Sequence, residues 1–431
     1  MEIRRYKNIL AIQSEPHRIW GFHRLNLDVA ELDQEAWQAM AAETNSEALN
    51  ELDEWSQEIG NETEDLKTPK GIRAFSINIA QVCNLKCSYC GADGDGTYGA
   101  RVPKADTTKV FRQLSRLLGD LPAHESFEIR FLGGEPLLYP KLIREISHFA
   151  QLLVAGRNIK LQFSIVTNGT LLSPENVELL AQLHCNVTIS LDASAETNDK
   201  VRRLKTGGSS TQLILDGLKE IQKVRHRLRG LHVNSVFGSH NTDVLSSYQF
   251  LQPFQFDSMN LNYAASDQDE TFSPRYVEGM RAVAEHALAE EGLMGLVRID
   301  QFKRPLSRLE TKTRTHDYCG AGKSLLQTDT KGDLHVCNWF MNDAKDRVGV
   351  IDHIDQKALE HYSPSLIELN HCDSCWAKHL CGGGCMFVNR TKTGDKHGKD
   401  PHFCNRSRFL AATAIDYYLK TLTKGTNNEA C

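Results

Sequence analysis

The sequence lacks the features that would place it in a membrane, on nucleic acid or in an oxidising compartment. Its 431 residues contain no apolar run long enough to span a bilayer, and the polar start MEIRRYKN has no signal-peptide hydrophobic region. A net charge of -5 gives no basic excess for nucleic acid. We therefore expect a cytoplasmic protein with neither nucleic-acid nor membrane partners.

Cysteine is also scarce, because the 12 cysteines are too few in a chain of this length for a disulfide scaffold. Their distribution is uneven, however. Three lie at 83, 87 and 90 and seven lie between 319 and 404, while Cys185 and Cys431 stand apart. Clustered thiols in a reducing compartment indicate metal binding rather than disulfides.

Residues 1–70 form a small N-terminal α+β unit in our interpretation. NILAIQ and RIWGFHRLNLDV are typical of short strands, and the segments around EAWQAM and ALNELDEWSQEI are typical of helices. The polar stretch GNETEDLKTPKG then indicates a linker. The residues leave two alternatives open, a helical cap on the next domain or a peptide-binding module.

Strands and helices alternate over residues 71–300. Six strand-like segments occur, at 74–80, 127–132, 161–166, 186–191, 231–237 and 259–263, with amphipathic helical patterns between them. One helix start is marked by Ser173 as N-cap and Pro174 in the first turn. This alternation predicts an α/β fold with a parallel sheet, and the right-handed crossover rule favours a partial (β/α)6 TIM-type barrel.

Beyond residue 301 the alternation stops. Short polar segments, glycines and cysteines dominate 301–431, which predicts a cysteine-rich domain held together by metal, followed by a final helix near 406–421.

Chemistry in a parallel barrel gathers where the strands end. Cys83, Gly133, Thr167 and Asp192 each follow a predicted strand, so we expect them on one rim. The stretch CNLKCSYC supplies three thiols, whereas zinc prefers four protein ligands. Three thiolates on a four-iron cubane leave one iron open for a small molecule.

The CxxxCxxC spacing after the first strand resembles the radical S-adenosylmethionine (radical SAM) superfamily. The resemblance implies that Cys83, Cys87 and Cys90 bind a [4Fe–4S] cluster whose open iron is chelated by SAM. It further implies reductive cleavage of SAM to a deoxyadenosyl radical, which the protein positions and shields.

Later segments match the same family in order. FLGGEP resembles its methionine-binding segment, TNG and SLD follow the third and fourth strands, and an aromatic residue lies between the second and third cysteines. Local alternatives are a helix cap at Glu135-Pro136 and a plain strand end at SLD. Asn198 stands where the family often has His, and we interpret it as not essential for SAM binding. The SAM-binding residues that the resemblance implies are Tyr89, Gly133, Gly134, Glu135, Thr167, Asn168, Ser190 and Arg202.

The seven later cysteines resemble the SPASM domain, and the whole resemblance covers roughly residues 72–407. It implies two auxiliary [4Fe–4S] clusters, and so three in all. The first would be held by Cys319, Cys337 and Cys385, and the second by Cys372, Cys375, Cys381 and Cys404. The alternative is one or two zinc ribbons. No cysteine between Cys185 and Cys319 completes the first set, so its fourth ligand could be a substrate thiolate, water or Cys431.

SPASM enzymes mostly modify peptides or proteins. We predict a ribosomal-peptide (RiPP) maturase that abstracts a hydrogen from a precursor peptide and installs a thioether, carbon–carbon or ether crosslink. Residues 1–70 loosely resemble a leader-recognition element, and the glycine-rich GADGDGTYG resembles a loop of thioether-forming maturases. Expected partners are a precursor peptide with a leader and an electron donor such as flavodoxin or ferredoxin.

Two other functions stay open. One is an anaerobic sulfatase maturase that forms formylglycine on a Cys or Ser. The other is a non-catalytic iron–sulfur scaffold or electron carrier, in which GGEP and SLD would have no purpose. The sequence identifies no catalytic acid or base.

Overall fold

The computed structural model describes residues 2–15, 18–42, 47–57, 64–66, 71–90, 103–265, 267, 269–341 and 343–426. The glycine-rich loop after Cys90 and the terminal Cys431 therefore lie outside the described residues. The chain divides into two compact units. Unit 1 comprises Met1–Lys67, Ser273–Cys319 and Pro364–Cys431, and unit 2 comprises Thr68–Phe272 and Gly320–Ser363.

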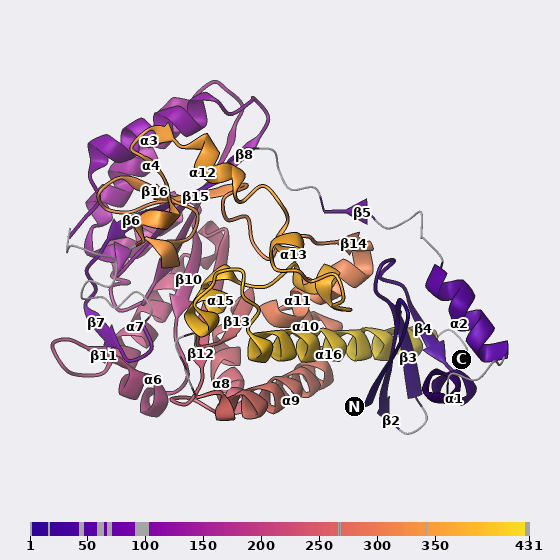
Figure 1. Cartoon of the computed structure of the whole chain (residues 1–431). Coiled ribbons are helices and arrows are strands. Elements are labelled where there is room, and N and C mark those ends of the chain that lie inside the picture. Colours follow the sequence, from indigo (N-terminus) through magenta and orange to yellow (C-terminus); the bar gives the residue numbers. More distant parts are fainter. Residues whose placement is uncertain are drawn as a thin grey trace. The chain divides into compact units, whose positions relative to one another are not determined.

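Unit 2 is built on six parallel strands that neighbour one another in chain order (Figure 1). The pairings are parallel throughout. All six predicted strand segments are confirmed. The strands are β6 (Ala74–Ala80), β8 (Ser126–Gly133), β9 (Lys160–Thr167), β10 (Asn186–Ser190), β12 (Gly230–Phe237) and β13 (Ser258–Tyr263).

Helices join these strands, and local sequence explains where they begin. Asp106 caps the first helix by accepting hydrogen bonds from the Thr108 and Lys109 amides, and Ser173 caps the third as predicted. Apolar residues at helical spacing, such as Val110 and Leu114, bury one face of each helix. The helices are α3 (Thr107–Gly119), α4 (Pro140–Val154), α5 (Pro174–Gln182), α6 (Ala195–Val201), α7 (Ser210–Lys223) and α8 (Val244–Leu251).

The β6 edge of the sheet is extended by later residues. β15 (Leu325–Thr328) pairs in parallel with β6, and the antiparallel strands β16 (Asp333–His335), β17 (Arg347–Val350) and β18 (His353–Ile354) follow. A short helix, α12 (Gln356–Glu360), ends this extension. Part of the region after residue 301 thus continues the parallel sheet of unit 2.

Unit 1 contains a four-stranded antiparallel sheet in the order β1-β2-β3-β4. Two of these strands were predicted and two were not. One face of the sheet is covered by α1 (Gln34–Ala42) and α2 (Glu47–Gln57), which bury Trp37 and Leu52 against Ile9 and Ile19. The strands are β1 (Glu2–Tyr6), β2 (Ile9–Glu15), β3 (Arg18–His23) and β4 (Val29–Leu32).

The other face of this sheet packs on the C-terminal part of unit 1. Trp20 and Phe22 share one core with Trp376 and Ile415, and the Phe22 and Trp376 rings meet edge to face at 6.1 Å. The remaining helices of unit 1 are α9 (Ser273–Glu291), α10 (Leu293–Val297), α11 (Asp300–Thr311), α13 (Leu366–Leu369), α14 (Lys378–Cys381), α15 (Met386–Thr393) and α16 (Pro401–Thr426).

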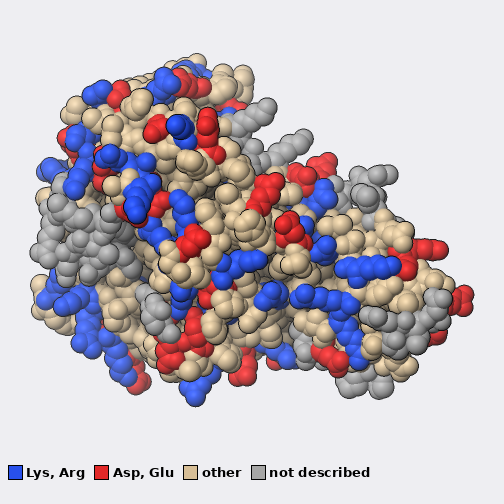
Figure 2. Space-filling view, in the orientation of Figure 1, with Lys and Arg blue, Asp and Glu red and all other residues tan. Residues whose placement is uncertain are grey.

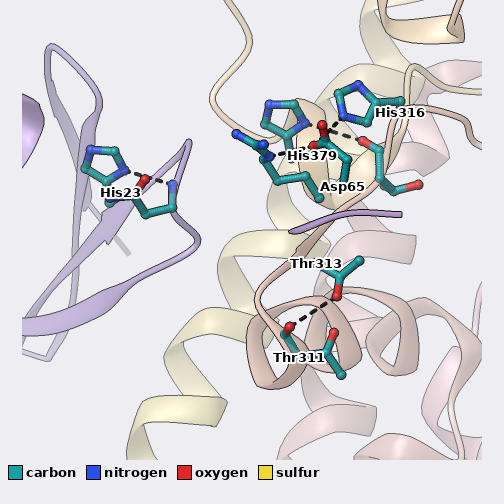
Figure 3. A network of polar contacts seen from close by, with 9 residues as sticks. His23, Asp65, Thr311, Thr313, His316 and His379 are labelled. Carbon is teal, nitrogen blue, oxygen red and sulfur yellow. Dashed lines mark hydrogen bonds and ion pairs between the residues drawn. The ribbon is translucent and has the colours of Figure 1, made fainter. Parts of the chain in front are cut away.

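A polar network ties part of the predicted linker to unit 1 (Figure 3). β5 (Glu64–Asp65) pairs with β14 (Thr313–Arg314). The Asp65 carboxylate accepts a hydrogen bond from Arg314 Nε at 2.7 Å and lies 2.9 Å from His316 Nε2. The His316 ring is 5.1 Å from that of His379, whose pKa burial lowers to about 4. In the described part of the chain, no helix is long and apolar enough to cross a membrane.

Candidate functional site: the cysteine loop and the second cysteine cluster

The three N-terminal cysteines lie in the loop that follows β6. β7 (Leu85–Cys87) pairs with β11 (Arg202–Leu204), which places Cys87 directly opposite Arg202. The Cys83 thiol accepts hydrogen bonds from the Leu85 amide at 3.4 Å and from Asn168 Nδ2 at 3.5 Å. Burial raises the pKa of Cys83, and raises that of Cys87 to about 11. Buried thiols of this kind fit a metal group, whose positive charge favours the thiolate.

Gly133 and Gly134 bring the loop after β8 against this cysteine loop. A Cβ at Gly133, whose φ is +134°, would lie 2.3 Å from the Ala80 carbonyl oxygen, and one at Gly134 would lie 2.4 Å from that of Val82. The Gly134 amide donates to Ala80 O at 2.6 Å and the Glu135 amide to Val82 O at 3.0 Å. In this structure the glycines therefore make room for protein backbone.

Glu135 joins the second and third strand ends. Its carboxylate is fully buried and accepts hydrogen bonds from the Leu137 amide (3.0 Å), the Thr167 hydroxyl (2.8 Å) and the Asn168 amide (2.7 Å). Burial raises its pKa to about 6, although the hydrogen bonds favour the charged form. The bond to Leu137 is the helix cap considered above, so Glu135 has this role and also organises the site.

A second buried network links the cysteine loop to the fourth strand. The Tyr89 hydroxyl donates to Asp192 Oδ2 at 2.5 Å and accepts from Arg202 Nη1 at 2.5 Å. The Tyr89 ring stacks on His240 with centroids 4.7 Å apart. Asp192 also accepts from the Val236 amide at 3.0 Å. Our list of SAM-binding residues omitted Asp192 and His240, although each lies just after a strand.

One hydrogen-bond donor of Arg202 has no partner among the described residues. Its side chain is buried, and within the described residues Nε has no hydrogen-bond partner. Burial alone would lower the pKa of Arg202, but Tyr89, Cys87 and Asp192 raise it well above the ordinary value, so the guanidinium stays charged. A buried cation with a free donor fits an anionic group such as a carboxylate.

Asn198 has a structural role that the sequence did not reveal. The side chain is fully buried. Its Oδ1 accepts from the Asp192 amide at 3.1 Å, and its Nδ2 donates to the Ser210 hydroxyl at 3.1 Å and the Thr211 hydroxyl at 2.8 Å. It thus fixes the loop after β10 to the start of α7. Ser190 is half-buried at the end of β10, opposite Asn234.

The second cysteine cluster lies in unit 1. One cavity of ≈ 270 Å³ is lined by all four predicted ligands of the second auxiliary cluster, Cys372, Cys375, Cys381 and Cys404. Four soft thiols around one cavity fit an iron–sulfur cluster. They share the cavity with basic side chains and with no carboxylate.

The other three later cysteines are divided between the units. Cys319 and Cys385 belong to unit 1, and Cys337 belongs to unit 2. Among the residues that the structure describes, no three His, Cys, Asp or Glu side chains form a group that could hold a single metal ion, whose ligands must lie closer together than the thiolates around a four-iron cluster.

In unit 2 the first strand of the parallel sheet leads into a loop with three cysteines, and residues that follow the next three strands contact this loop. Residues 77–244 match the model of the Radical SAM superfamily. The chain contains a radical SAM domain and is a radical SAM enzyme.

Two curated relatives match most of the chain. The radical SAM cyclopropyl synthase TigE of Paramaledivibacter caminithermalis is 20% identical over 397 residues, covering 85% of this chain and 79% of TigE. The serine-type anaerobic sulfatase-maturating enzyme of Klebsiella aerogenes is 23% identical over 337 residues, covering 74% and 80%.

Two solved structures share the fold. anSMEcpe with bound AdoMet and Kp18Cys peptide has a TM-score of 0.67 at 18% identity, covering 82% of this chain and 99% of that one. Streptococcus suis SuiB bound to precursor peptide SuiA has a TM-score of 0.52 at 15% identity, covering 93% and 100%.

Proposed function

We propose that this radical SAM enzyme is a maturase that installs an intramolecular crosslink, thioether or carbon–carbon/ether, in a ribosomally made precursor peptide. The proposal includes a partial (β/α)6 barrel, three [4Fe–4S] clusters and SAM. A flavodoxin or ferredoxin would supply electrons. When bound, the first cluster and SAM supply reductive cleavage of SAM and hence hydrogen-atom abstraction.

The main support for a peptide substrate is the open edge of the N-terminal sheet of unit 1. Within the described strands β1 pairs only with β2, so its outer edge offers backbone groups to an extended peptide. The structure of SuiB, which was solved with its precursor peptide, covers 93% of this chain. The relative TigE is a radical SAM cyclopropyl synthase.

The residues around the cysteine loop would bind and orient the cofactors. Cys83, Cys87 and Cys90 would hold the first cluster, and Arg202 would direct its free Nε at the methionine carboxylate. Tyr89, stacked on His240, would form the wall beside the adenine. Gly133, Gly134, Glu135, Thr167, Asn168 and Ser190 would complete the SAM site.

The auxiliary clusters would occupy the later cysteines. Cys372, Cys375, Cys381 and Cys404 would hold one cluster in the cavity of unit 1. Cys319, Cys337 and Cys385 would hold the other with one iron open. A crosslink formed with loss of two hydrogens requires an acceptor for one electron, and a cluster held by these cysteines would supply that chemistry.

The test is the intact mass of a candidate precursor peptide, encoded beside this gene, after anaerobic incubation with reconstituted enzyme, SAM and reductant. A crosslink appears as loss of two hydrogens, and thiol alkylation separates thioether from carbon–carbon products. An unchanged mass with deoxyadenosine still formed would rule out that peptide as the substrate.

The β1 edge can be tested with a matched pair of variants. Tyr6 and Ile9 flank a two-residue hairpin turn and pair with each other. Along an antiparallel ladder, backbone groups alternately face the partner strand and face away from it, so the N–H and C=O of Ile3 face away from β2. Ile3→Pro removes an outward N–H and should weaken binding of the leader, whereas Ile3→Ala keeps the N–H and should bind normally. Equal leader affinity in the two variants would contradict leader binding at this edge.

A sulfatase maturase is the second candidate. Its support is the similarity to the serine-type anaerobic sulfatase-maturating enzyme of Klebsiella aerogenes over 74% of this chain. Formylglycine on a sulfatase peptide, detected by mass and by hydrazide capture, would favour it over the crosslinking reaction.

A further inference from the structure

The cavity that holds the four thiols in unit 1 lies at the protein surface. Its volume is ≈ 270 Å³, and Cys372, Cys375, Cys381 and Cys404 line it. Each of these cysteines is half-buried rather than enclosed. A redox group held there would therefore lie close to the solvent, within reach of a partner protein.

The same cavity is surrounded by positive charge. Arg5, Lys378, Lys399 and Arg408, the cationic rim, all line it, and no Asp or Glu does. The Lys399 ammonium donates to the His371 carbonyl, and Arg408 donates to the Asn405 side chain. Within the described residues, none of the four cations forms an ion pair with a carboxylate. The rim stands out because the whole chain carries a net charge of -5.

Two carboxylates lie nearby but do not neutralise the rim. Asp400 is buried, accepts from the Phe403 amide at 2.8 Å and faces Arg406 at 3.9 Å. Asp373 is exposed beside Cys372. On the face shown in Figure 2, Lys and Arg side chains form a run over the region where Figure 1 places α16 and the N-terminal strands.

The need to balance the charge of a bound cluster would explain only two of the four cations of the rim. Lys378 and Arg408 are half-buried beside the thiols, where a positive charge acts on the cluster with little screening. Arg5 and Lys399 are exposed. Charges in water contribute little to a buried group, but they steer an approaching partner of opposite charge.

We propose that the cationic rim docks an acidic one-electron carrier protein, which exchanges electrons with the iron–sulfur cluster at these four cysteines. This inference rests on the auxiliary cluster of the proposed function. In the step that can be measured, a reduced carrier gives one electron to the cluster. The carrier is oxidised by one electron and the cluster is reduced by one, with no bond broken and no proton moved. Weak, salt-sensitive contacts of this kind are typical of redox partners.

The experiment compares two double variants of the fully loaded enzyme in anaerobic stopped-flow, with a recombinant acidic flavodoxin in its reduced form as the probe. The test variant carries Arg5→Glu and Lys399→Glu. The control carries Lys141→Glu and Lys303→Glu at two exposed lysines that do not line the cavity, and makes the same change in net charge. Flavodoxin oxidation is followed at about 0.05 M and at about 1 M salt, where the Debye length falls to about 3 Å.

We expect the second-order rate constant of the test variant to fall by roughly tenfold or more at low salt, and to approach that of the control at high salt. The midpoint potential and EPR spectrum of the cluster should stay unchanged. Equal rates in the two variants overturn the docking surface. The docking surface is also overturned if the rate constant of the test variant stays low at high salt and the midpoint potential of the cluster shifts. In that case Arg5 and Lys399 would act on the cluster itself and not on the approach of the carrier.

Iron analysis separates this inference from the proposed function. The cluster assignment itself is refuted if the wild-type enzyme binds iron for fewer than three clusters and Cys375→Ala does not lower that iron content. A full complement of iron with equal rates would refute only the docking surface.

Discussion

Replacing Gly134 by Ala tests whether the second-strand glycine positions the cysteine loop. The new Cβ would lie 2.4 Å from the Val82 carbonyl oxygen, 2.6 Å from its carbon and 3.0 Å from the Cys83 amide nitrogen. All three are backbone atoms, so no side chain can rotate away and the loop itself must move. Forcing an extra methyl into such a contact costs about 1–3 kcal/mol.

The expected result is a lower melting temperature of the cluster-free protein, by about 2–4 °C for each kcal/mol lost. The Cys83 position should shift with the loop, so the loaded variant should form deoxyadenosine more slowly and bind SAM more weakly. Gly119→Ala is the control, because a Cβ there meets nothing within 4 Å at the end of α3. The reasoning is refuted if Gly134→Ala melts with the control and cleaves SAM at the wild-type rate.

Three further substitutions test the buried polar groups and the shared core. Asn198→Ala leaves the Asp192 amide unpaired at a cost of about 1–3 kcal/mol, and should raise KM for SAM more than it lowers kcat. Glu135→Gln should remove a pH dependence of the cluster-free protein. The folded pKa of about 6 exceeds the ordinary 4.5, so wild-type stability rises by about 2 kcal/mol as pH falls through that window, and urea titration of both proteins detects it. Trp376→Ala should cost about 3–5 kcal/mol and lower the melting temperature of unit 1, and a change below about 1 kcal/mol would contradict the shared core.

Local sequence signals were sufficient to predict the parallel strands and the convergence of the residues that follow them. The segment AFSINIA at β6 is buried along its whole length, and Ser76 and Asn78 are its only polar residues, as is typical of a strand covered on both faces. Because parallel strands end at the same edge, the residues after β6, β8 and β9 must converge. Cys83, Glu135 and Asn168 do so in the structure.

The features that were missed depend on contacts between distant residues. β15 to β18 are two to four residues long, too short for periodicity to detect, and they form because β6 offers a free edge. Asn198 is a single polar residue whose three partners become neighbours only after α6 and α7 fold. The sequence also could not show that a Cβ at Gly134 would meet the Val82 backbone, because close approach to backbone and close approach to a ligand both favour glycine.

The shared core of unit 1 changes how the N-terminal sheet should be interpreted. A detachable leader-binding module would have its own core and a polar face toward the rest of the chain. Here one face of the sheet, through Trp20 and Phe22, packs on Trp376, which lies next to the proposed cluster ligand Cys375. Removing the sheet would expose this aromatic core and would leave the loop of Cys372 and Cys375 without its support. In the proposed function, leader binding and retention of the second auxiliary cluster would therefore be coupled through one hydrophobic core, and a truncation that removes the N-terminal sheet should also lower the iron content at these cysteines.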